Sequence, residues 1–247
     1  MGKRLVLVTG GAKGIGHACA QSFSELGDRV IVCGRDEAAL ADVTSSGDIS
    51  ARQCDITDEA SVDALFTEAG PVDVLVNNAG VAHSAPAHCY ELSDWERMLA
   101  VNATGAFLCT RAALRGMRDR STGRIVTVAS VAGLFGWRYT AGYTASKHAA
   151  IGLMRAVSAE VAGTGITANA VCPGYVRSAM TDRSVANIVD KTGRSEAEAL
   201  EELLRFTPLG RLVEPAEVAH AVCFLASDLA GAINGQTIAL DGGGVQS

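Results

Sequence analysis

The sequence has no excess of basic residues and no long hydrophobic run. Its 247 residues carry a formal net charge of −6, which argues against a broad surface for nucleic acid. The start holds too few consecutive apolar residues for a signal peptide, and no later run approaches the length of a membrane span. We therefore expect a cytoplasmic protein that binds neither nucleic acid nor a membrane.

Paired cysteines are missing as well. None of the seven cysteines belongs to a C-x-x-C pair, so we expect reduced and mostly buried thiols rather than a disulfide framework. His83, His88 and Cys89 are close in sequence, but their spacing matches no zinc pattern. The sequence therefore predicts no metal site.

Alternating strand and helix patterns are the main feature that the sequence does have. Short runs rich in Val and Ile are typical of buried strands in a parallel sheet. These runs are Leu5–Thr9, Arg29–Cys33, Ile49–Cys54, Val72–Val76, Arg124–Ala129, Ile166–Val171 and Thr237–Leu240. The segments with helical spacing are 14–26, 36–44, 58–69, 93–119, 142–163 and 214–226. The alternation predicts an α/β fold, a Rossmann-type doubly wound parallel sheet of seven strands with helices on both faces.

No repeat, low-complexity segment or linker divides the chain. Residues 1–247 are therefore expected to form a single dinucleotide-binding and catalytic domain. The exception to the alternation is the polar, charge-rich stretch 175–210, for which we predict a substrate loop or mobile lid.

A glycine-rich turn joins the first predicted strand to the first predicted helix. Residues 9–16 read Thr-Gly-Gly-Ala-Lys-Gly-Ile-Gly, and glycines there let the backbone approach a pyrophosphate whose charge lies at the helix N-terminus. The spacing is G-x-x-x-G-x-G, and it resembles the short-chain dehydrogenase/reductase family. The resemblance extends over essentially the whole chain. Its further motifs are the N-N-A-G of residues 77–80, Asn102, Ser130, the Y-x-x-x-K pair Tyr143 and Lys147, and the turn Pro173-Gly174.

The resemblance implies a set of site residues. The catalytic residues would be Asn102, Ser130, Tyr143 and Lys147. The cofactor-binding residues would be Thr9, Gly10, Lys13, Gly14, Ile15, Gly16, Arg35, Asp55, Ile56, Asn78, Ala79, Gly80, Tyr143, Lys147, Pro173, Gly174, Val176 and Ser178. Ser178 stands where the family commonly has a threonine, so the hydroxyl is retained.

The spacing of Tyr143 and Lys147 has a chemical use. Four residues apart on a helix, the two side chains share one face. A tyrosine has a pKa of about 10, and a nearby ammonium together with the positive nicotinamide of the oxidised cofactor should lower it. Tyr143 would then exchange a proton with the substrate oxygen. By the resemblance, Lys147 also holds the nicotinamide ribose, Ser130 binds the carbonyl and Asn102 holds a water.

The residues after the second predicted strand bear on the choice of cofactor. NAD enzymes place a carboxylate there, whereas NADP enzymes offer an arginine to the 2′-phosphate. Here the acidic position is Gly34 and Arg35 follows it. Lys13 adds a second positive contact, and Asp36 would weaken the field. The sequence therefore favours NADP(H), with NAD(H) as the alternative.

The substrate is suggested by resemblance alone. The segment 142–174 is similar to bacterial 3-oxoacyl-thioester and polyketide ketoreductases. We therefore expect NADPH-dependent reduction of a ketone to a secondary alcohol, in a 3-oxoacyl thioester of coenzyme A or of a carrier protein or in a polyketide-like substrate, with free ketones also open. Arg118, Arg120 and Arg124 could dock an acidic carrier, although 162–165 offers no second basic patch.

Three functions fit these residues. Beside the ketoreductase stand a catabolic dehydrogenase of hydroxyacyl, cyclic or steroid alcohols and a non-enzymatic nucleotide-sensing scaffold. Arg35 in place of an acid favours the first over the second, and the intact catalytic group argues against the third. The apolar stretch 134–137 is expected to line the substrate pocket or to pack under the lid. The apolar region 221–240 resembles the family's tetramer interface, so we expect a homotetramer.

Overall fold

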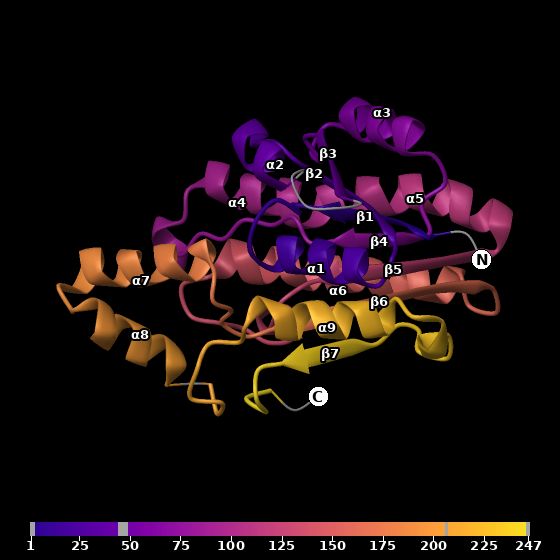
Figure 1. The fold of residues 1–247 in the computed structure, drawn as a ribbon. Helices are drawn as coiled ribbons and strands as arrows, with labels where there is room; N and C mark the ends of the chain where they lie inside the picture. Colours follow the sequence, from indigo (N-terminus) through magenta and orange to yellow (C-terminus); the bar gives the residue numbers. More distant parts are fainter. Residues whose placement is uncertain (1–2, 44–48, 206, 246–247) are drawn as a thin grey trace.

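A sheet of seven parallel strands forms the centre of the molecule (Figure 1). The structure is a computed structural model, and it describes residues 3–43, 49–205 and 207–245. The strands lie in the order β3-β2-β1-β4-β5-β6-β7. Their bounds are β1 Leu5–Thr9, β2 Arg29–Gly34, β3 Ile49–Gln53, β4 Val74–Asn77, β5 Thr122–Val128, β6 Gly165–Pro173 and β7 Thr237–Leu240. Each agrees with its predicted run to within two residues at either end, which confirms the strand prediction.

Two hydrophobic layers cover the sheet, because alternate strand residues point to opposite faces. Leu5 and Leu7 of β1 belong to the apolar cluster on one face, and Val6 and Val8 belong to the cluster on the other. The helices over the first cluster are α3 (Glu59–Ala69), α5 (Ala106–Arg120) and α6 (Ala141–Glu160). Those over the second are α1 (Gly14–Glu25), α2 (Glu37–Val43) and α9 (Pro215–Leu225). The predicted doubly wound fold with helices on both faces is thus confirmed.

The strand order creates a crevice at one edge of the sheet. β1 pairs with β2 on one side and with β4 on the other, so the chain changes direction across the sheet at this point. Doubly wound sheets bind ligands at such a switch point, outside the carboxyl ends of the strands. The loops after β1, β4, β5 and β6 meet at this edge, and they carry most of the predicted site residues.

The predicted helix 93–119 is interrupted. The chain forms α4 (Leu92–Leu99), a π-helical turn (Ala100–Gly105) and then α5. A π turn holds one residue more than an α turn, and the apolar repeat does not reveal it. It places Asn102, which is 3% exposed, inside the molecule. The expectation of one continuous helix was therefore wrong.

The stretch 175–210 is largely helical, which was not predicted. It contains α7 (Ala179–Thr192) and α8 (Glu196–Leu204), drawn in orange in Figure 1. Each helix begins with a serine cap: Ser178 Oγ accepts from Thr181 N, and Ser195 forms a capping box with Glu198. The capping residues are present in the sequence, but the high charge of the stretch favoured the prediction of a loop. Its role as a lid stays a prediction.

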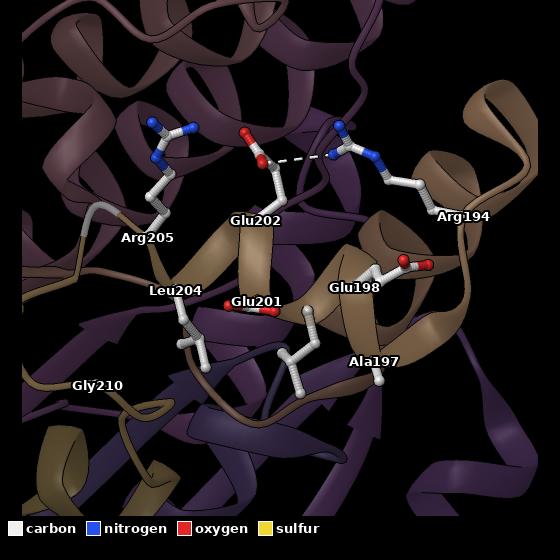
Figure 2. Close-up of a pocket in the computed structure, with 9 residues that line it drawn as sticks. Arg194, Ala197, Glu198, Glu201, Glu202, Leu204, Arg205 and Gly210 are labelled. Atoms are coloured by element: carbon white, nitrogen blue, oxygen red, sulfur yellow. Dashed lines mark hydrogen bonds and ion pairs between the residues drawn. The ribbon is translucent and has the colours of Figure 1, made fainter.

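A groove of about 810 Å³ runs along α8 (Figure 2). Arg194 and Glu202, 3.4 Å apart, lie on one side of the helix, and Leu204 and Ala197 lie on the other. None of the residues predicted for catalysis or cofactor binding lines this groove. It is therefore separate from the crevice at the carboxyl ends of the strands.

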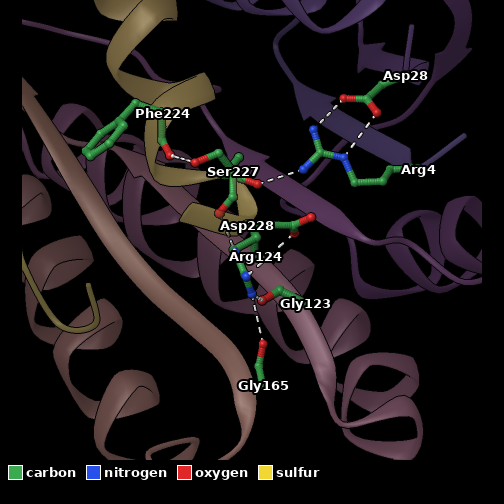
Figure 3. A network of polar contacts seen from close by, with 9 residues as sticks. Arg4, Asp28, Gly123, Arg124, Gly165, Phe224, Ser227 and Asp228 are labelled. Atoms are coloured by element: carbon green, nitrogen blue, oxygen red, sulfur yellow. Dashed lines mark hydrogen bonds and ion pairs between the residues drawn. The ribbon is translucent and has the colours of Figure 1, made fainter. Parts of the chain in front are cut away.

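Two arginines hold the C-terminal end of α9 against the amino edge of the sheet (Figure 3). Arg4 makes two hydrogen bonds to Asp28 and donates from Nη1 to Ala226 O at 2.7 Å. Arg124 donates from Nε to Ser227 O at 3.3 Å. Cations are favourable there because the carbonyls at a helix C-terminus carry partial negative charge. The pair thus fixes α9 on the sheet at the end remote from the crevice.

This placement corrects the docking expectation for Arg124. Its side chain is only 12% exposed, and Nη1 also donates to Gly165 O at 2.8 Å. Arg120 Nη2 donates to Val72 O at 2.8 Å. Both guanidinium groups are engaged by backbone carbonyls, so they stabilise the sheet edge. No helix in the described ranges is long and apolar enough to cross a bilayer.

Candidate active site

The glycine-rich loop between β1 and α1 depends on the absence of side chains. Gly10 and Gly14 have positive φ angles of 64° and 55°, a region that residues with a Cβ atom rarely adopt. A Cβ atom on Gly16 would lie 2.4 Å from both Asn78 Nδ2 and Gly10 O. Lys13, the N-cap residue of α1, makes no side-chain hydrogen bond to the helix. The loop therefore offers backbone N–H groups at a helix N-terminus, which suits a phosphate.

Thr9 and Asn78 fasten the loop after β4 to the glycine loop. Thr9 Oγ1 accepts from the backbone N–H groups of Asn78 and Ala79, both at 3.0 Å. Asn78 Nδ2 donates to Thr9 O at 2.9 Å and to Gly10 O at 3.1 Å. The structure thus brings together predicted cofactor-binding residues from two separate motifs.

The basic residues near the end of β2 are paired with carboxylates. Lys13 Nζ lies 2.7 Å from Asp36 Oδ2, and this hydrogen bond is the main cause that lowers the pKa of Asp36. Arg35 Nη1 lies 3.8 Å from Asp55 Oδ2. The pKa of Asp55 is lowered first by hydrogen bonds from Thr57 and to a smaller extent by Arg35. The side chains of Lys13 and Arg35 are largely exposed, as residues that bind a phosphate must be, but each is paired with a carboxylate.

The side chain of Ile56 does not face the crevice. It is 8% exposed, and its Cδ1 lies 2.6 Å from the point that a Cβ atom on Gly105 would occupy. It therefore supports the π-helical turn, and a contact between Ile56 and a nucleotide would have to come from its backbone.

Tyr143, Lys147 and Ser130 gather where β5 ends and α6 begins. Lys147 Nζ lies 5.7 Å from the centroid of the Tyr143 ring and donates to Val128 O at 3.0 Å. Ser130 Oγ accepts from Ala132 N at 3.1 Å. The structure brings these three predicted residues together, as the four-residue spacing of Tyr143 and Lys147 implied.

Burial changes the proton affinities of this group. It raises the pKa of Tyr143, and a hydrogen bond with Ser130 opposes that rise. It lowers the pKa of Lys147 to about 8, with Cys172 acting in the opposite direction. The direction for Tyr143 is opposite to the one expected from the sequence. The expectation included the positive nicotinamide of the oxidised cofactor, whereas among the chain's own groups burial raises the pKa of Tyr143 more than the hydrogen bond with Ser130 lowers it.

Asn102 approaches Lys147 through an amide that is already hydrogen-bonded. Its Oδ1 accepts from Val81 N, and its Nδ2 donates to Val81 O and to Ser146 Oγ, each at 2.9 Å. A Cβ atom on Gly80 would lie 3.2 Å from Asn102 Oδ1 and 3.5 Å from Lys147 Nζ. A water held by Asn102 would therefore use its oxygen or its backbone. Ser146 was not singled out from the sequence, although it lies inside the Y-x-x-x-K motif.

The turn after β6 approaches the glycine loop from the other side. β6 ends at Pro173, and Gly174 and the buried Val176 follow it. Ser178 Cβ lies 3.8 Å from the point that a Cβ atom on Gly14 would occupy. The Ser178 hydroxyl caps α7 and donates to Val176 O at 3.2 Å. The structure therefore places these predicted residues beside the glycine loop, with the serine hydroxyl already engaged.

Three aromatic side chains connect the stretch 134–137 to the beginning of 175–210. The ring centroids of Phe135 and Trp137 are 5.3 Å apart, and those of Trp137 and Tyr175 are 6.2 Å apart, both edge to face. Burial first, and Tyr175 to a smaller extent, raise the pKa of Tyr143. The apolar stretch 134–137 thus contacts the first residue of 175–210. Tyr175 was not singled out from the sequence.

His83 takes part in a different cluster. Its Nε2 lies 3.3 Å from Asp94 Oδ2, and its ring meets Tyr90 edge to face at 5.3 Å. Across residues 3–43, 49–205 and 207–245, no three metal-ligating side chains gather closely enough to hold an ion. His83 therefore belongs to a polar and aromatic cluster in and after the loop that follows β4.

Known proteins share both the sequence and the fold. The short chain dehydrogenase family matches residues 4–188. An acetoacetyl-CoA reductase of Rhizobium meliloti (strain 1021) is 39% identical over 97% of this chain and 98% of the relative. The granaticin polyketide synthase putative ketoacyl reductase 1 of Streptomyces violaceoruber is 39% identical over 98% of this chain and 93% of the relative.

A solved structure agrees with these relatives. A variant of actinorhodin polyketide ketoreductase, crystallised with NADPH, superposes with a TM-score of 0.92 at 37% identity. The match covers 98% of this chain and 97% of that chain. The family match spans well over half of the chain and includes Asn102, Ser130, Tyr143 and Lys147. The chain therefore belongs to the short chain dehydrogenase family of oxidoreductases.

Proposed function

We propose that the protein uses NADPH to reduce a ketone to a secondary alcohol, and that its substrate is a 3-oxoacyl thioester. The observation that carries the proposal is the position of Lys147 Nζ, 5.7 Å from the centre of the Tyr143 ring, at the sheet edge that also holds the glycine loop. Relatives named acetoacetyl-CoA reductase and ketoacyl reductase, which match nearly the whole chain, support the substrate class.

The residues present fit a nicotinamide dinucleotide. Gly10 and Gly16 leave no room for side chains, and the N-terminus of α1 suits a pyrophosphate. Gly80 keeps a side chain out of the space beside Asn102 Oδ1 and Lys147 Nζ, where a ribose hydroxyl could be held. When bound, NADPH supplies the hydride that the carbonyl carbon takes up.

Tyr143 serves as the proton donor. Because burial raises its pKa, the phenol is protonated at neutral pH and can hydrogen-bond the carbonyl oxygen. As negative charge develops on that oxygen, Ser130 donates a second hydrogen bond to it, and the Tyr143 proton moves to the substrate oxygen. Lys147 stabilises the phenolate left behind. A proton from solvent then restores Tyr143.

The preference for NADPH is proposed from Lys13 and Arg35. The position of the carboxylate in NAD enzymes is Gly34 here, so no acid is present to repel a 2′-phosphate at that point. Lys13 and Arg35 are both exposed and can turn toward an anion. Asp36 is the opposing group, because it competes with the phosphate for Lys13.

We also propose that α7 and α8 cover the substrate. Asn187 Nδ2 of α7 donates to Ser84 Oγ at 3.1 Å, which joins α7 to the loop after β4. Trp137 and Tyr175 connect the beginning of this segment to the loop before α6. Tyr143 and Lys147 lie between Trp137 and Tyr175 in the sequence, so movement of α7 and α8 would open or close the access to them.

A cytoplasmic homotetramer is proposed from the resemblance to the family. Phe224 is 47% exposed and Leu229 is 95% exposed, so the region 221–240 offers apolar surface to a second copy. Light scattering of the purified protein tests the assembly. A mass close to four times 25.5 kDa is expected, and a mass near 25.5 kDa would contradict it.

The function is tested by following the absorbance of the reduced cofactor in the presence of acetoacetyl-coenzyme A. Turnover with a strong preference for NADPH is expected. Turnover with a preference for NADH would overturn the cofactor proposal alone. No turnover with either, together with oxidation of a hydroxyacyl, cyclic or steroid alcohol by the oxidised cofactor, would replace the reductase by the catabolic dehydrogenase.

A further inference from the structure

A buried hydroxyl links Asn102 to the helix that carries Tyr143. Ser146 is 0% exposed. Its Oγ donates to Tyr143 O at 2.8 Å and is 2.9 Å from Asn102 Nδ2. A hydroxyl has one hydrogen, and here that hydrogen is used by the Tyr143 carbonyl. Ser146 Oγ can therefore only accept from the Asn102 amide, so the contact has a fixed direction.

Together with the two hydrogen bonds to Val81, this direction sets which end of the Asn102 amide faces Lys147. Both N–H groups of the amide are bonded, one to Ser146 Oγ and one to Val81 O. Oδ1 accepts from Val81 N and keeps one free lone pair. Oδ1 and Lys147 Nζ lie 3.2 Å and 3.5 Å from the point that a Cβ atom on Gly80 would occupy. The negative end of the amide dipole is thus held toward the ammonium.

We propose that Ser146 is a positioning residue that holds the Asn102 amide with its oxygen toward Lys147, and so keeps the lysine ammonium charged and in place. The kinetic consequence rests on the proposed function, whereas the arrangement of the three side chains does not. Ser146 touches neither the phenol of Tyr143 nor the ammonium, so it acts through Asn102.

Lys147 is sensitive to such a dipole because few groups stabilise its charge. Burial lowers its pKa to about 8. The groups that face it are the Tyr143 ring on α6, Val128 O on β5 and the Cys172 thiol on β6. Among the described residues, no carboxylate contributes to its pKa. A dipole held beside the ammonium therefore matters more here than it would at an exposed lysine.

Removing the Ser146 hydroxyl leaves one Asn102 N–H without its acceptor. A buried amide hydrogen without a partner is unfavourable, and only the two hydrogen bonds to Val81 then hold the amide. Any tilt of the amide that gives this N–H a new acceptor moves Oδ1 away from Lys147. Ser146→Ala is therefore the variant that tests the proposal.

Ser158→Ala is the matched control. Ser158 lies on the same helix, is 7% exposed, and its Oγ donates to Arg155 O at 2.7 Å by the same step of three residues. Both variants lose a buried hydroxyl that bonds the preceding helical turn. Only Ser146→Ala also loses a contact with Asn102, so a difference between the two reports that contact.

Carbon-13 NMR of ε-labelled lysine measures the titration of Lys147, because the chain has only four lysines and Lys147→Arg identifies the signal. The midpoint of Lys147 should fall by about half a pH unit in Ser146→Ala and stay at the wild-type value in Ser158→Ala. An unchanged midpoint in Ser146→Ala, or equal shifts in both variants, would overturn the proposal.

Turnover supplies the second readout. In Ser146→Ala, kcat should fall by about threefold to tenfold while the KM for the cofactor is unchanged, and the alkaline limb of the rate should move to lower pH. Ser146→Cys keeps a weak acceptor of similar size, so the titration midpoint of Lys147 in that variant should be intermediate. It replaces Ser146→Ala if that variant does not fold.

The NMR titration needs no substrate. A wild-type protein that reduces no ketone would therefore overturn the proposed function and leave this test in force.

Discussion

Lys13 Nζ lies 2.7 Å from Asp36 Oδ2, so the ammonium proposed to bind the 2′-phosphate of NADPH already has a negative partner. Asp36 Oδ1 also accepts from Ala39 N at 3.1 Å and thereby caps the start of α2. Its pKa is lowered, chiefly by Lys13, so the carboxylate is charged at neutral pH. A phosphate must therefore displace Asp36 or share Lys13 with it.

Asp36→Asn should strengthen the binding of NADPH. The amide can keep the cap on Ala39 N while the competing charge is removed. We expect the KM for NADPH to fall by about threefold and the KM for NADH to change little, as measured by initial rates with each cofactor. Glu37→Gln removes the adjacent charge without breaking the Lys13–Asp36 pair and is the control. An equal gain for both cofactors would contradict the role of Lys13.

Tyr143→Phe should leave cofactor binding nearly intact while removing most turnover. The variant keeps the ring beside Lys147 but has no proton to give to the carbonyl oxygen. We expect kcat to fall by at least about a hundredfold, with the dissociation constant of NADPH, measured by fluorescence titration, close to that of the wild type. Tyr175→Phe removes a phenol from the neighbouring aromatic group and should retain most activity. Full activity in Tyr143→Phe would disprove the acid–base role.

The sheet and the place where the candidate site residues meet were predictable because they follow from local patterns. Runs such as Leu5–Thr9 are apolar on both faces, and only a sheet covered on both sides buries them. The glycine loop and the pair Tyr143 and Lys147 each depend on spacing within one element. Parallel strands bring their carboxyl ends to one edge, so the loops that follow them meet there.

Features that depend on tertiary contacts were not predictable. The π-helical turn at Ala100–Gly105 differs from an α-helix by one residue per turn, which leaves the apolar pattern almost unchanged. The pKa of Tyr143 depends first on burial, which raises it more than the hydrogen bond with Ser130 lowers it. The contact between Ser146 and Asn102 joins residues 44 positions apart. Sequence spacing alone carries no information about it.

Gly16→Ala should disrupt the glycine loop. The added Cβ atom would lie 2.4 Å from Asn78 Nδ2 and from Gly10 O, so the start of α1 would have to move away from the loop after β4. We expect a loss of about 2 kcal/mol in the free energy of unfolding and weaker binding of the cofactor. Urea denaturation and fluorescence titration measure the two effects.

Gly152→Ala is the control for that variant. Gly152 lies on the exposed side of α6, and no described atom is within 4 Å of its Cβ position. The same substitution should therefore be neutral or stabilise the helix by about 1 kcal/mol at most. If the two variants had the same unfolding free energy and the same cofactor affinity, the close approach of Gly16 to Asn78 would have no energetic role.

Lys147 should couple the stability of the protein to pH. Burial lowers its pKa from 10.5 to about 8. Between these values the unfolded chain holds a proton that the folded chain has released, so the free energy of unfolding rises with pH through this window. Below it, the folded protein bears the whole cost of a buried ammonium, which corresponds to about 3 kcal/mol for a shift of this size.

Lys147→Met removes that cost and should stabilise the protein while abolishing turnover. We expect a gain of about 1 to 3 kcal/mol near pH 7, reduced by the hydrogen bond that Val128 O loses, and a much smaller gain near pH 10. Urea denaturation at a fixed protein concentration measures both. Arg155→Met, on the exposed face of the same helix, removes a cation that is not buried, so its effect should not change between these pH values. If the gain in Lys147→Met also did not change with pH, the Lys147 ammonium would not be desolvated in the folded protein. Burial could then not be the cause of its lowered pKa.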